Sequence, residues 1–129
     1  MAEKFFEKDD FDKFDKLLAN LDKILVEPEK PALVHGDLWG GNIVCDTKIS
    51  PVLIDPACYV GHPEVDIAMT ELFGGFANEF YDFYKKEGLI QSGYVQRRDL
   101  YNLYHILNHL NMFGKSYLPT ARSIIQSYV

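Results

Sequence analysis

Asp37, Asn42 and Asp55 are three polar residues whose types and spacing suit phosphoryl transfer. Residues 35–42 read His-Gly-Asp-Leu-Trp-Gly-Gly-Asn, which has the H-x-D-x-x-x-x-N spacing of a phosphotransferase catalytic loop. Asp37 can take a proton from an attacking hydroxyl group, and is therefore the predicted catalytic base. The amide oxygen of Asn42 and the carboxylate of Asp55 are hard oxygen ligands of the kind that Mg²⁺ accepts, so they are the predicted metal ligands.

The segment between Asn42 and Asp55 predicts a β-hairpin. Two short β-prone runs, 42–45 and 52–54, stand on either side of the turn-rich stretch 46–51. Because a hairpin brings its two ends back together, Asn42 and Asp55 are expected to be neighbours. The expected chemistry is phosphoryl transfer that depends on a nucleotide and Mg²⁺.

The rest of the chain predicts helices around this loop. Apolar residues at spacings of three and four indicate an amphipathic helix over 9–26, which Asp9 or Asp10 can cap. A short strand at 32–34 leads into the catalytic loop. Further helices are expected at 65–73, 78–87, 96–113 and 119–128. The prediction is therefore a single domain, 1–129, of the α+β class that is mostly α-helical and carries one small hairpin.

Longer runs of sequence resemble a known family. Residues 54–69 read Ile-Asp-Pro-Ala-Cys-Tyr-Val-Gly-His-Pro-Glu-Val-Asp-Ile-Ala-Met, and residues 72–76 read Leu-Phe-Gly-Gly-Phe. With the loop at 35–42 and the segment 103–114, they look like the fructosamine (ketosamine) kinases, in the aminoglycoside-phosphotransferase branch of the protein-kinase-like fold. The loop motif alone indicates only the wide superfamily. The tryptophan in the loop and the two longer runs narrow the resemblance to this family.

This resemblance implies the C-terminal lobe of a kinase-like fold. The implied activity is ATP-dependent phosphorylation of the sugar 3-hydroxyl in a fructosamine-type adduct of an amine or lysine. The 129 residues contain no G-x-G-x-x-G cover loop and no Val-Ala-Ile-Lys-type strand to hold the triphosphate. We therefore expect that the N-terminal lobe is missing, because the chain is a fragment, a truncated reading frame or half of a split enzyme. Alone, it is expected to be inactive.

Two alternatives stay open. The generic loop also fits a kinase for another small amine or sugar, such as an aminoglycoside or choline. A non-catalytic interaction or regulatory module is the alternative from a different class, and the missing lysine and glycine-rich loop favour it for the isolated chain.

Three residues are candidates for substrate contact. Trp39 lies within the loop, and an aromatic face suits a sugar ring or an amine-bearing substrate, although core packing is an equal alternative. Tyr59 has the same two interpretations. Glu64 either contacts substrate or caps the helix that begins near Pro63.

Two further residues are expected to support the loop. The resemblance implies that His35 packs beneath the loop and hydrogen-bonds to backbone. Asp66 lies early in a buried helix, where a carboxylate needs donors, and the backbone N–H groups of the catalytic loop are the expected ones. His105 and His109 are four residues apart but lack a third ligand, so packed or surface histidines are favoured over zinc.

Composition excludes several classes of protein. A net charge of −6 argues against a nucleic-acid or anionic-membrane surface. No apolar run reaches the roughly 18 residues of a membrane span, and residues 1–10 lack the apolar segment of a signal peptide. Cys45 and Cys58 form no metal or redox motif, which indicates reduced thiols in a cytoplasmic protein.

Apolar surface near the start of the first helix predicts association. Four phenylalanines gather there, at positions 5, 6, 11 and 14. Apolar patches that lack a native neighbour tend to find partners. We therefore expect a homodimer or a docked partner chain.

Overall fold

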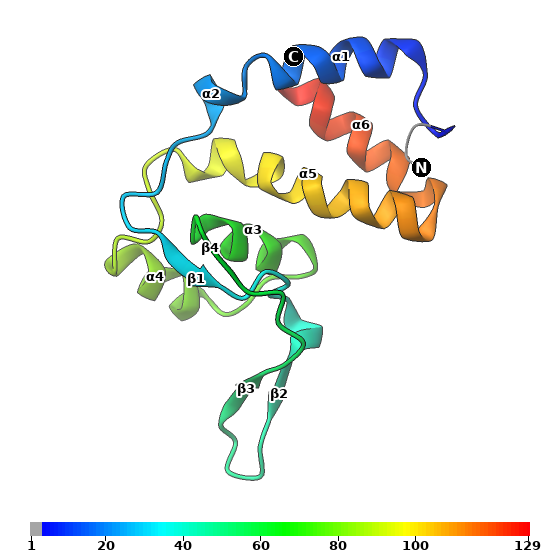
Figure 1. Ribbon diagram of the computed structural model, residues 1–129. Coiled ribbons are helices and arrows are strands. Elements are labelled where there is room, and N and C mark those ends of the chain that lie inside the picture. The colour runs from blue at the N-terminus through cyan, green and yellow to red at the C-terminus, as the bar shows by residue number, and fades with distance from the viewer. Residues whose placement is uncertain (1–3) are drawn as a thin grey trace. The chain divides into compact units, whose positions relative to one another are not determined.

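The computed structural model describes residues 4–129, which are mostly helical (Figure 1). Positions 1–3, the start of the predicted domain and of the charged N-terminal stretch, lie outside the described residues. The helices are α1 Lys8–Leu18, α2 Leu21–Ile24, α3 Glu64–Leu72, α4 Asn78–Lys86, α5 Tyr94–Phe113 and α6 Leu118–Ser127. The strands are β1 Ala32–Val34, β2 Ile43–Cys45, β3 Pro51–Leu53 and β4 Tyr59–Gly61, with short 3₁₀ turns at Gly40–Asn42 and Lys115–Tyr117. The predicted α+β, mostly helical class is confirmed.

The chain divides into two compact units. Unit 1 comprises Met1–Val26 and Val95–Val129, and unit 2 comprises Glu27–Tyr94. All the strands, α3 and α4 belong to unit 2, as do the predicted catalytic and metal-binding residues. The single domain expected from the sequence stays a prediction.

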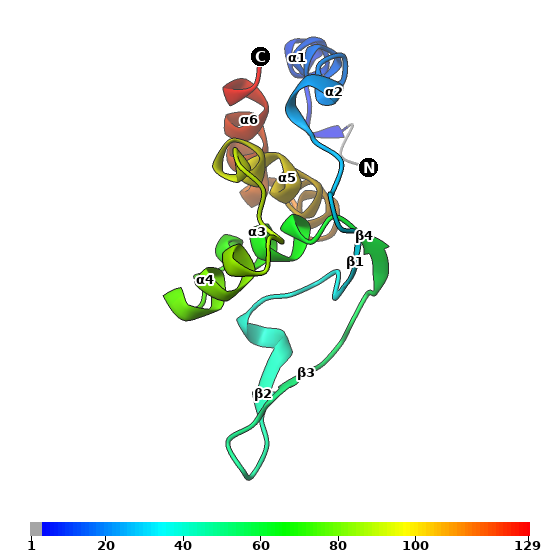
Figure 2. The same cartoon turned by 90° about the vertical axis from the view of Figure 1, so that its left-hand side faces the viewer.

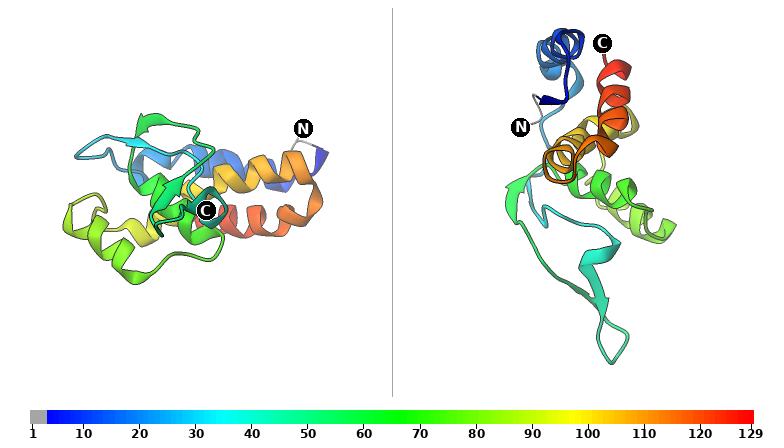
Figure 3. Two further views of the ribbon diagram at one scale, coloured as in Figure 1. Left: turned by 90° about the horizontal axis from the view of Figure 1, so that it is seen from below. Right: turned by 90° about the vertical axis from the view of Figure 1, so that its right-hand side faces the viewer.

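In unit 1 the chain reverses direction between α5 and α6, at Gly114. Gly114 has φ 91°, in the left-handed region, and its N–H donates to the Leu110 carbonyl oxygen at 3.1 Å. This conformation ends α5, so that α6 runs back toward α1, which it contacts (Figures 1 and 3). The core of the unit includes Leu17, Leu110 and Ile125, each at most 2% exposed.

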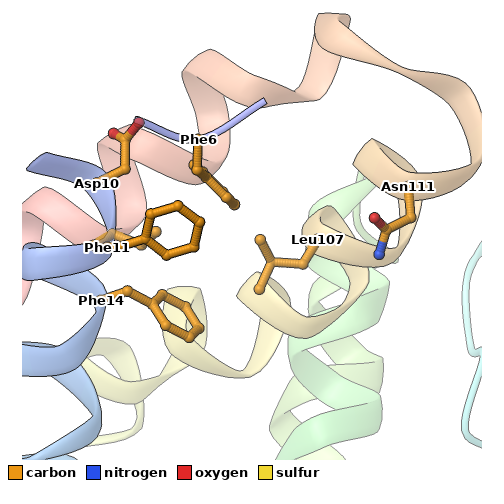
Figure 4. A pocket seen from close by; sticks show the side chains of 7 residues that line it. Phe6, Asp10, Phe11, Phe14, Leu107 and Asn111 are labelled. Atoms are coloured by element: carbon orange, nitrogen blue, oxygen red, sulfur yellow. The ribbon is translucent and has the colours of Figure 1, made fainter. Parts of the chain in front are cut away.

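An apolar cavity of about 220 Å³ lies in unit 1 (Figure 4). Its lining residues are Phe6, Asp10, Phe11, Phe14, Leu107, Asn111 and Ile125. The rings of Phe11 and Phe14 on α1 point toward Leu107 of α5 (Figure 4), and the Phe6 ring contacts the Phe11 ring edge-on, with centroids 6.1 Å apart. The cavity therefore occupies the region where the sequence predicted apolar surface.

The predicted helix over 9–26 is wrong in length, because Asn20 interrupts it. The Asn20 side-chain nitrogen donates to the Lys16 carbonyl oxygen at 2.8 Å, and its Oδ1 accepts a hydrogen bond from Lys23 Nζ at 2.9 Å. An asparagine side chain that bonds nearby backbone competes with the hydrogen bonds of a helix. Consequently α1 ends at Leu18, and α2 is a single separate turn.

Asp10 connects the start of α1 to α6. Its Oδ2 accepts a hydrogen bond from the Glu7 backbone N–H at 2.8 Å, in a capping box whose N-cap is Glu7 rather than the predicted Asp9 or Asp10. Its two carboxylate oxygens also accept hydrogen bonds from Arg122 Nε and Nη2, at 2.9 and 2.7 Å. The Arg122 hydrogen bond holds the pKa of Asp10 below its ordinary value.

Unit 2 contains two antiparallel strand pairs. In the predicted hairpin, β2 pairs with β3 in the register Ile43↔Leu53, and Figure 2 shows it extending away from α3 and α4. The second pair joins β1 to β4, with Val34 opposite Tyr59. The sequence predicted β1 but not β4, because β4 exists only through its pairing with β1, a segment far away in the sequence.

The helices of unit 2 begin and end close to the predicted residues. Pro63 precedes α3, and the middle of that helix is fully buried at Ile67 and Ala68. Gly74 and Gly75 have φ 112° and 73°. These conformations end the helix, and glycine adopts them without the steric cost that other residues meet. Within residues 4–129, no helix combines the length and apolar character needed to cross a membrane.

Replacing Asp10 by Asn is expected to lower the free energy of unfolding at pH 7 by about 1–3 kcal/mol, the range for hydrogen bonds to charged groups. The pKa of Asp10 is lower in the folded chain, so its stabilisation is present above the unfolded value of about 3.9. It is lost as the pH falls through the folded pKa. Urea denaturation as a function of pH measures both effects.

Asp9→Asn is the matched control. Asp9 is the preceding residue, its side chain is 76% exposed, and it pairs with Lys13 at 2.6 Å within the same helix. Such a pair contributes about 0.5 kcal/mol or less. An equal loss of stability in the two variants would contradict the importance of the Asp10–Arg122 contact.

Candidate active site

Asp66 binds the start of the catalytic loop. Its Oδ2 accepts a hydrogen bond from the His35 backbone N–H at 2.6 Å, and its Oδ1 accepts one from the Gly36 N–H at 2.9 Å. These are the contacts that the sequence predicted for a carboxylate only 7% exposed in the first turn of α3. Two backbone donors offset the cost of burying the charge. Burial and, second, the Asp66 charge raise the pKa of Tyr84.

His35 joins the loop to the segment that follows β3. Its Nε2 lies 2.9 Å from the Ile54 carbonyl oxygen, and its Nδ1 lies 3.3 Å from the Asp37 backbone N–H. Because a carbonyl oxygen only accepts and an amide N–H only donates, these neighbours select the tautomer with hydrogen on Nε2. The His35 carbonyl oxygen also accepts a hydrogen bond from the Ala57 N–H at 2.8 Å.

Gly36 is a position that the sequence did not single out. Its φ is +84°, and a Cβ atom there would lie 2.2 Å from the Ala57 carbonyl oxygen. Both the backbone conformation and the close approach require glycine. The sequence signal that could have indicated this backbone constraint is the glycine itself, between His35 and Asp37 in the loop motif.

The side chains of Asp37 and Asn42 are in direct contact. Asn42 Nδ2 donates to Asp37 Oδ2 at 3.1 Å and to the Asp37 carbonyl oxygen at 2.9 Å. Asn42 is buried and Asp37 is half-buried. Because the amide nitrogen serves Asp37, the amide oxygen is the polar atom of Asn42 that can bind a cation.

Asp55 lies at the same end of the hairpin as Asn42. The Ile54 N–H donates to the Asn42 carbonyl oxygen at 3.0 Å, one position beyond the Ile43↔Leu53 pair. The predicted return of the hairpin to its starting point is therefore confirmed. Asp55 is exposed and has φ 49°, a left-handed conformation that is uncommon outside glycine and often found at functional sites. Ligation of one ion by Asn42 and Asp55 stays a prediction.

The three candidates for substrate contact differ in exposure. Trp39 is 37% exposed and Tyr59 is 50% exposed, which favours surface contact over core packing. Glu64 is fully buried, and its Oε1 accepts a hydrogen bond from the Gln91 backbone N–H at 2.8 Å. This contact favours the supporting interpretation of Glu64, since a buried carboxylate reaches a substrate only if its neighbours move.

The two helical histidines are packed against rings. His109 Nδ1 lies 2.7 Å from the His105 carbonyl oxygen. The His109 ring centroid is 5.4 Å from that of Phe113 and 5.2 Å from that of Tyr117. Across the part of the chain that the structure describes, no three His, Cys, Asp or Glu side chains gather as a metal cluster.

Known proteins resemble almost the whole chain. A family model described as fructosamine kinase matches residues 2–129. A Vibrio parahaemolyticus protein named as a probable ketoamine kinase is 50% identical over 122 residues, covering 94% of this chain and 40% of that protein. The chloroplastic protein-ribulosamine 3-kinase of Arabidopsis thaliana is 52% identical over 100 residues, covering 78% of this chain and 30% of that protein. The chain thus spans well under half the length of these relatives.

A solved structure has the same fold. The crystal structure of a Thermobifida fusca protein assigned as a fructosamine-3-kinase matches with a TM-score of 0.87 and 33% identity. The match covers 98% of this chain and 44% of that protein. The predicted protein-kinase-like fold is confirmed by this likeness.

Asp66→Asn is expected to lower the free energy of unfolding by about 2 kcal/mol, because an amide offers one oxygen to two backbone donors. Asp55→Asn is the comparison variant, and is expected to change it by less than about 0.5 kcal/mol, since Asp55 is exposed and Asn tolerates a left-handed backbone. Urea denaturation measures both. An Asp66→Asn chain as stable as the parent would contradict the supporting role.

Proposed function

Because this chain belongs to the fructosamine kinase family, we propose that it carries the catalytic loop of an ATP-dependent kinase that phosphorylates ketosamines. The proposed acceptor is the 3-hydroxyl of the sugar moiety in a glycated amine. The observation that carries the proposal is the contact of Asn42 with Asp37 at the end of the hairpin that also leads to Asp55. The names of the relatives support a ketoamine acceptor.

Asp37 is the proposed catalytic base. Asn42 holds one carboxylate oxygen, Oδ2, and the other faces the acceptor hydroxyl and takes its proton. The acceptor oxygen then forms a bond to the γ-phosphorus as the bond to the bridging oxygen breaks, and ADP leaves. Asn42 thus orients the base without taking part in the proton transfer.

The residues at the end of the hairpin fit Mg²⁺. An amide oxygen and a carboxylate are hard ligands, and two protein oxygens leave the remaining positions of the ion to phosphates and water. Asn42 and Asp55 would hold it there. When bound, Mg²⁺ neutralises charge that develops on the transferred phosphoryl group. The Ala57–His35 backbone hydrogen bond of 2.8 Å fixes the chain just beyond Asp55.

The remaining candidates are given positioning or recognition roles in this proposal. Asp66 and His35 hold the loop, and Glu64 supports α3 from its buried position. Trp39 and Tyr59 contact the substrate. Retention of the base and both metal ligands argues against a non-catalytic module.

Groups outside these 129 residues are proposed to hold the triphosphate, since the sequence has no glycine-rich loop and no matching lysine strand. The hairpin exposes apolar side chains against which such groups can pack: Val44, Val52 and Leu53 are 45, 42 and 55% exposed.

Cytoplasmic location is part of the same proposal, because the exposed, unbridged Cys45 and Cys58 fit a reducing compartment.

A chimera tests the proposed chemistry. The matching C-terminal segment of the Thermobifida fusca relative would be replaced by this chain, and phosphorylation of fructosyl-lysine would be followed by ADP release. We expect the chimera to be active and the isolated chain to show no turnover. Asp37→Asn should lower kcat of the chimera by about 10²–10⁴-fold, the usual contribution of a general base. Full activity of that variant would contradict the assignment of Asp37.

The apolar surface of unit 1 is proposed to contact a second copy of the chain or a partner chain. Phe11 is 42% exposed beside the apolar cavity. Light scattering at micromolar concentration is expected to give the mass of a dimer, and Phe11→Ser is expected to give a monomer, because a hydroxyl replaces an exposed ring. A monomeric parent chain would overturn the homodimer.

A further inference from the structure

We propose that Gly41 and Phe73 position the Trp39 indole, which thereby forms a preformed wall for the sugar ring of the acceptor. This inference rests on the proposed function, and it assigns roles to two residues that the catalytic chemistry does not use. It concerns the binding of a ketosamine rather than the transfer of the phosphoryl group.

Gly41 makes room for the indole. A Cβ atom at Gly41 would lie 2.2 Å from Trp39 Cη2 and 2.4 Å from Cζ2, so the six-membered ring lies over the Gly41 backbone. The requirement at Gly41 is for space, since its φ is outside the left-handed region. The adjacent Gly40 has no atom within 4 Å of such a Cβ. Of these two adjacent glycines, Gly41 is therefore the one that makes room for Trp39.

The local backbone directs the ring onto Gly41. Trp39 has an extended backbone, φ −147° and ψ 170°, and stands immediately before the 3₁₀ turn Gly40–Asn42. The Asn42 N–H donates to the Trp39 carbonyl oxygen at 2.9 Å, which closes this turn. The same turn that places Asn42 beside Asp37 therefore also places the indole.

Phe73 holds the indole from a different element. The two ring centroids are 5.7 Å apart at an interplanar angle of 62°, an edge-on contact of the kind that aromatic pairs prefer. Phe73 is the residue that follows α3, and the loop after it is fixed by hydrogen bonds. The Gly75 N–H donates to the Thr70 carbonyl oxygen at 3.0 Å, and the Phe76 N–H donates to the Tyr81 hydroxyl oxygen at 2.9 Å.

An indole held in this way favours binding of a ring. Trp39 and Phe73 remain 37% and 40% exposed, so the pair is a surface feature two residues from the proposed base. A side chain that is already ordered loses little conformational freedom when a ligand binds, and affinity rises accordingly. Removing the positioning contacts should therefore weaken acceptor binding without changing the groups that perform the chemistry.

Trp39 is the only tryptophan of the chain, so tryptophan fluorescence reports on this ring alone. The test titrates Nα-acetyl-fructosyl-lysine into the full 129-residue chain and follows emission. We expect a saturable change in the parent and in Gly40→Ala, the matched control. In Gly41→Ala and Phe73→Leu the dissociation constant should rise about tenfold, as expected for loss of an aromatic contact.

Each outcome decides the inference. Equal affinities in all four chains would overturn the positioning roles of Gly41 and Phe73. If the emission of the parent chain did not change on addition of the ketosamine, the proposal that Trp39 contacts the sugar ring would be overturned. Circular dichroism identifies a variant that fails to fold, and Phe73→Leu, which adds no atom to the loop, then carries the test. The titration needs no phosphoryl transfer, so the two proposals can fail separately. If the chain binds the ketosamine but the chimera is inactive, the role of Trp39 in binding stands and the proposed kinase activity is refuted.

Discussion

The buried Asp66 carboxylate is the constraint on which the geometry of the loop depends. It is 7% exposed and accepts hydrogen bonds from two consecutive backbone N–H groups, those of His35 and Gly36. A buried carboxylate without donors would cost several kcal/mol, so the first turn of α3 and the end of β1 must stay together. The loop is thereby fixed at its entry, before any residue with a proposed chemical role.

The other contacts of unit 2 extend this fixed point toward the proposed site. Gly36 allows the close approach of Ala57, whose N–H bonds to the His35 carbonyl oxygen, and the His35 ring reaches the Ile54 carbonyl oxygen. These contacts hold the start of the loop beside the exit of the hairpin. The 3₁₀ turn then carries Asn42 back to Asp37, while Asp55 follows β3 in a left-handed conformation. Hydrogen bonds from the side chains of Asp66, His35 and Asn42 to backbone groups therefore account for most of the arrangement.

How much the sequence could predict depended on how local each signal was. Spacing alone indicated Asp37, Asn42 and the hairpin, and the cost of a buried charge indicated the partners of Asp66. The break at Asn20 was missed because side-chain competition is weaker than the apolar period around it. Two features were missed because no local sequence pattern indicates them. They are strand β4 and the space that Trp39 needs over Gly41, and both depend on contacts that only the folded chain makes.

Asn42 and Asp55 are proposed to bind one divalent cation beside Asp37. Mn²⁺, a paramagnetic substitute for Mg²⁺, broadens the NMR signals of amides near its binding site. A titration of the ¹⁵N-labelled chain with Mn²⁺ and a nucleotide is predicted to broaden the amides of residues 36–43 and of Ile54, Asp55 and Ala57 first, and Asn42→Ala or Asp55→Ala should abolish this pattern. Broadening centred instead on the acidic residues of α1, unchanged in both variants, would contradict the account.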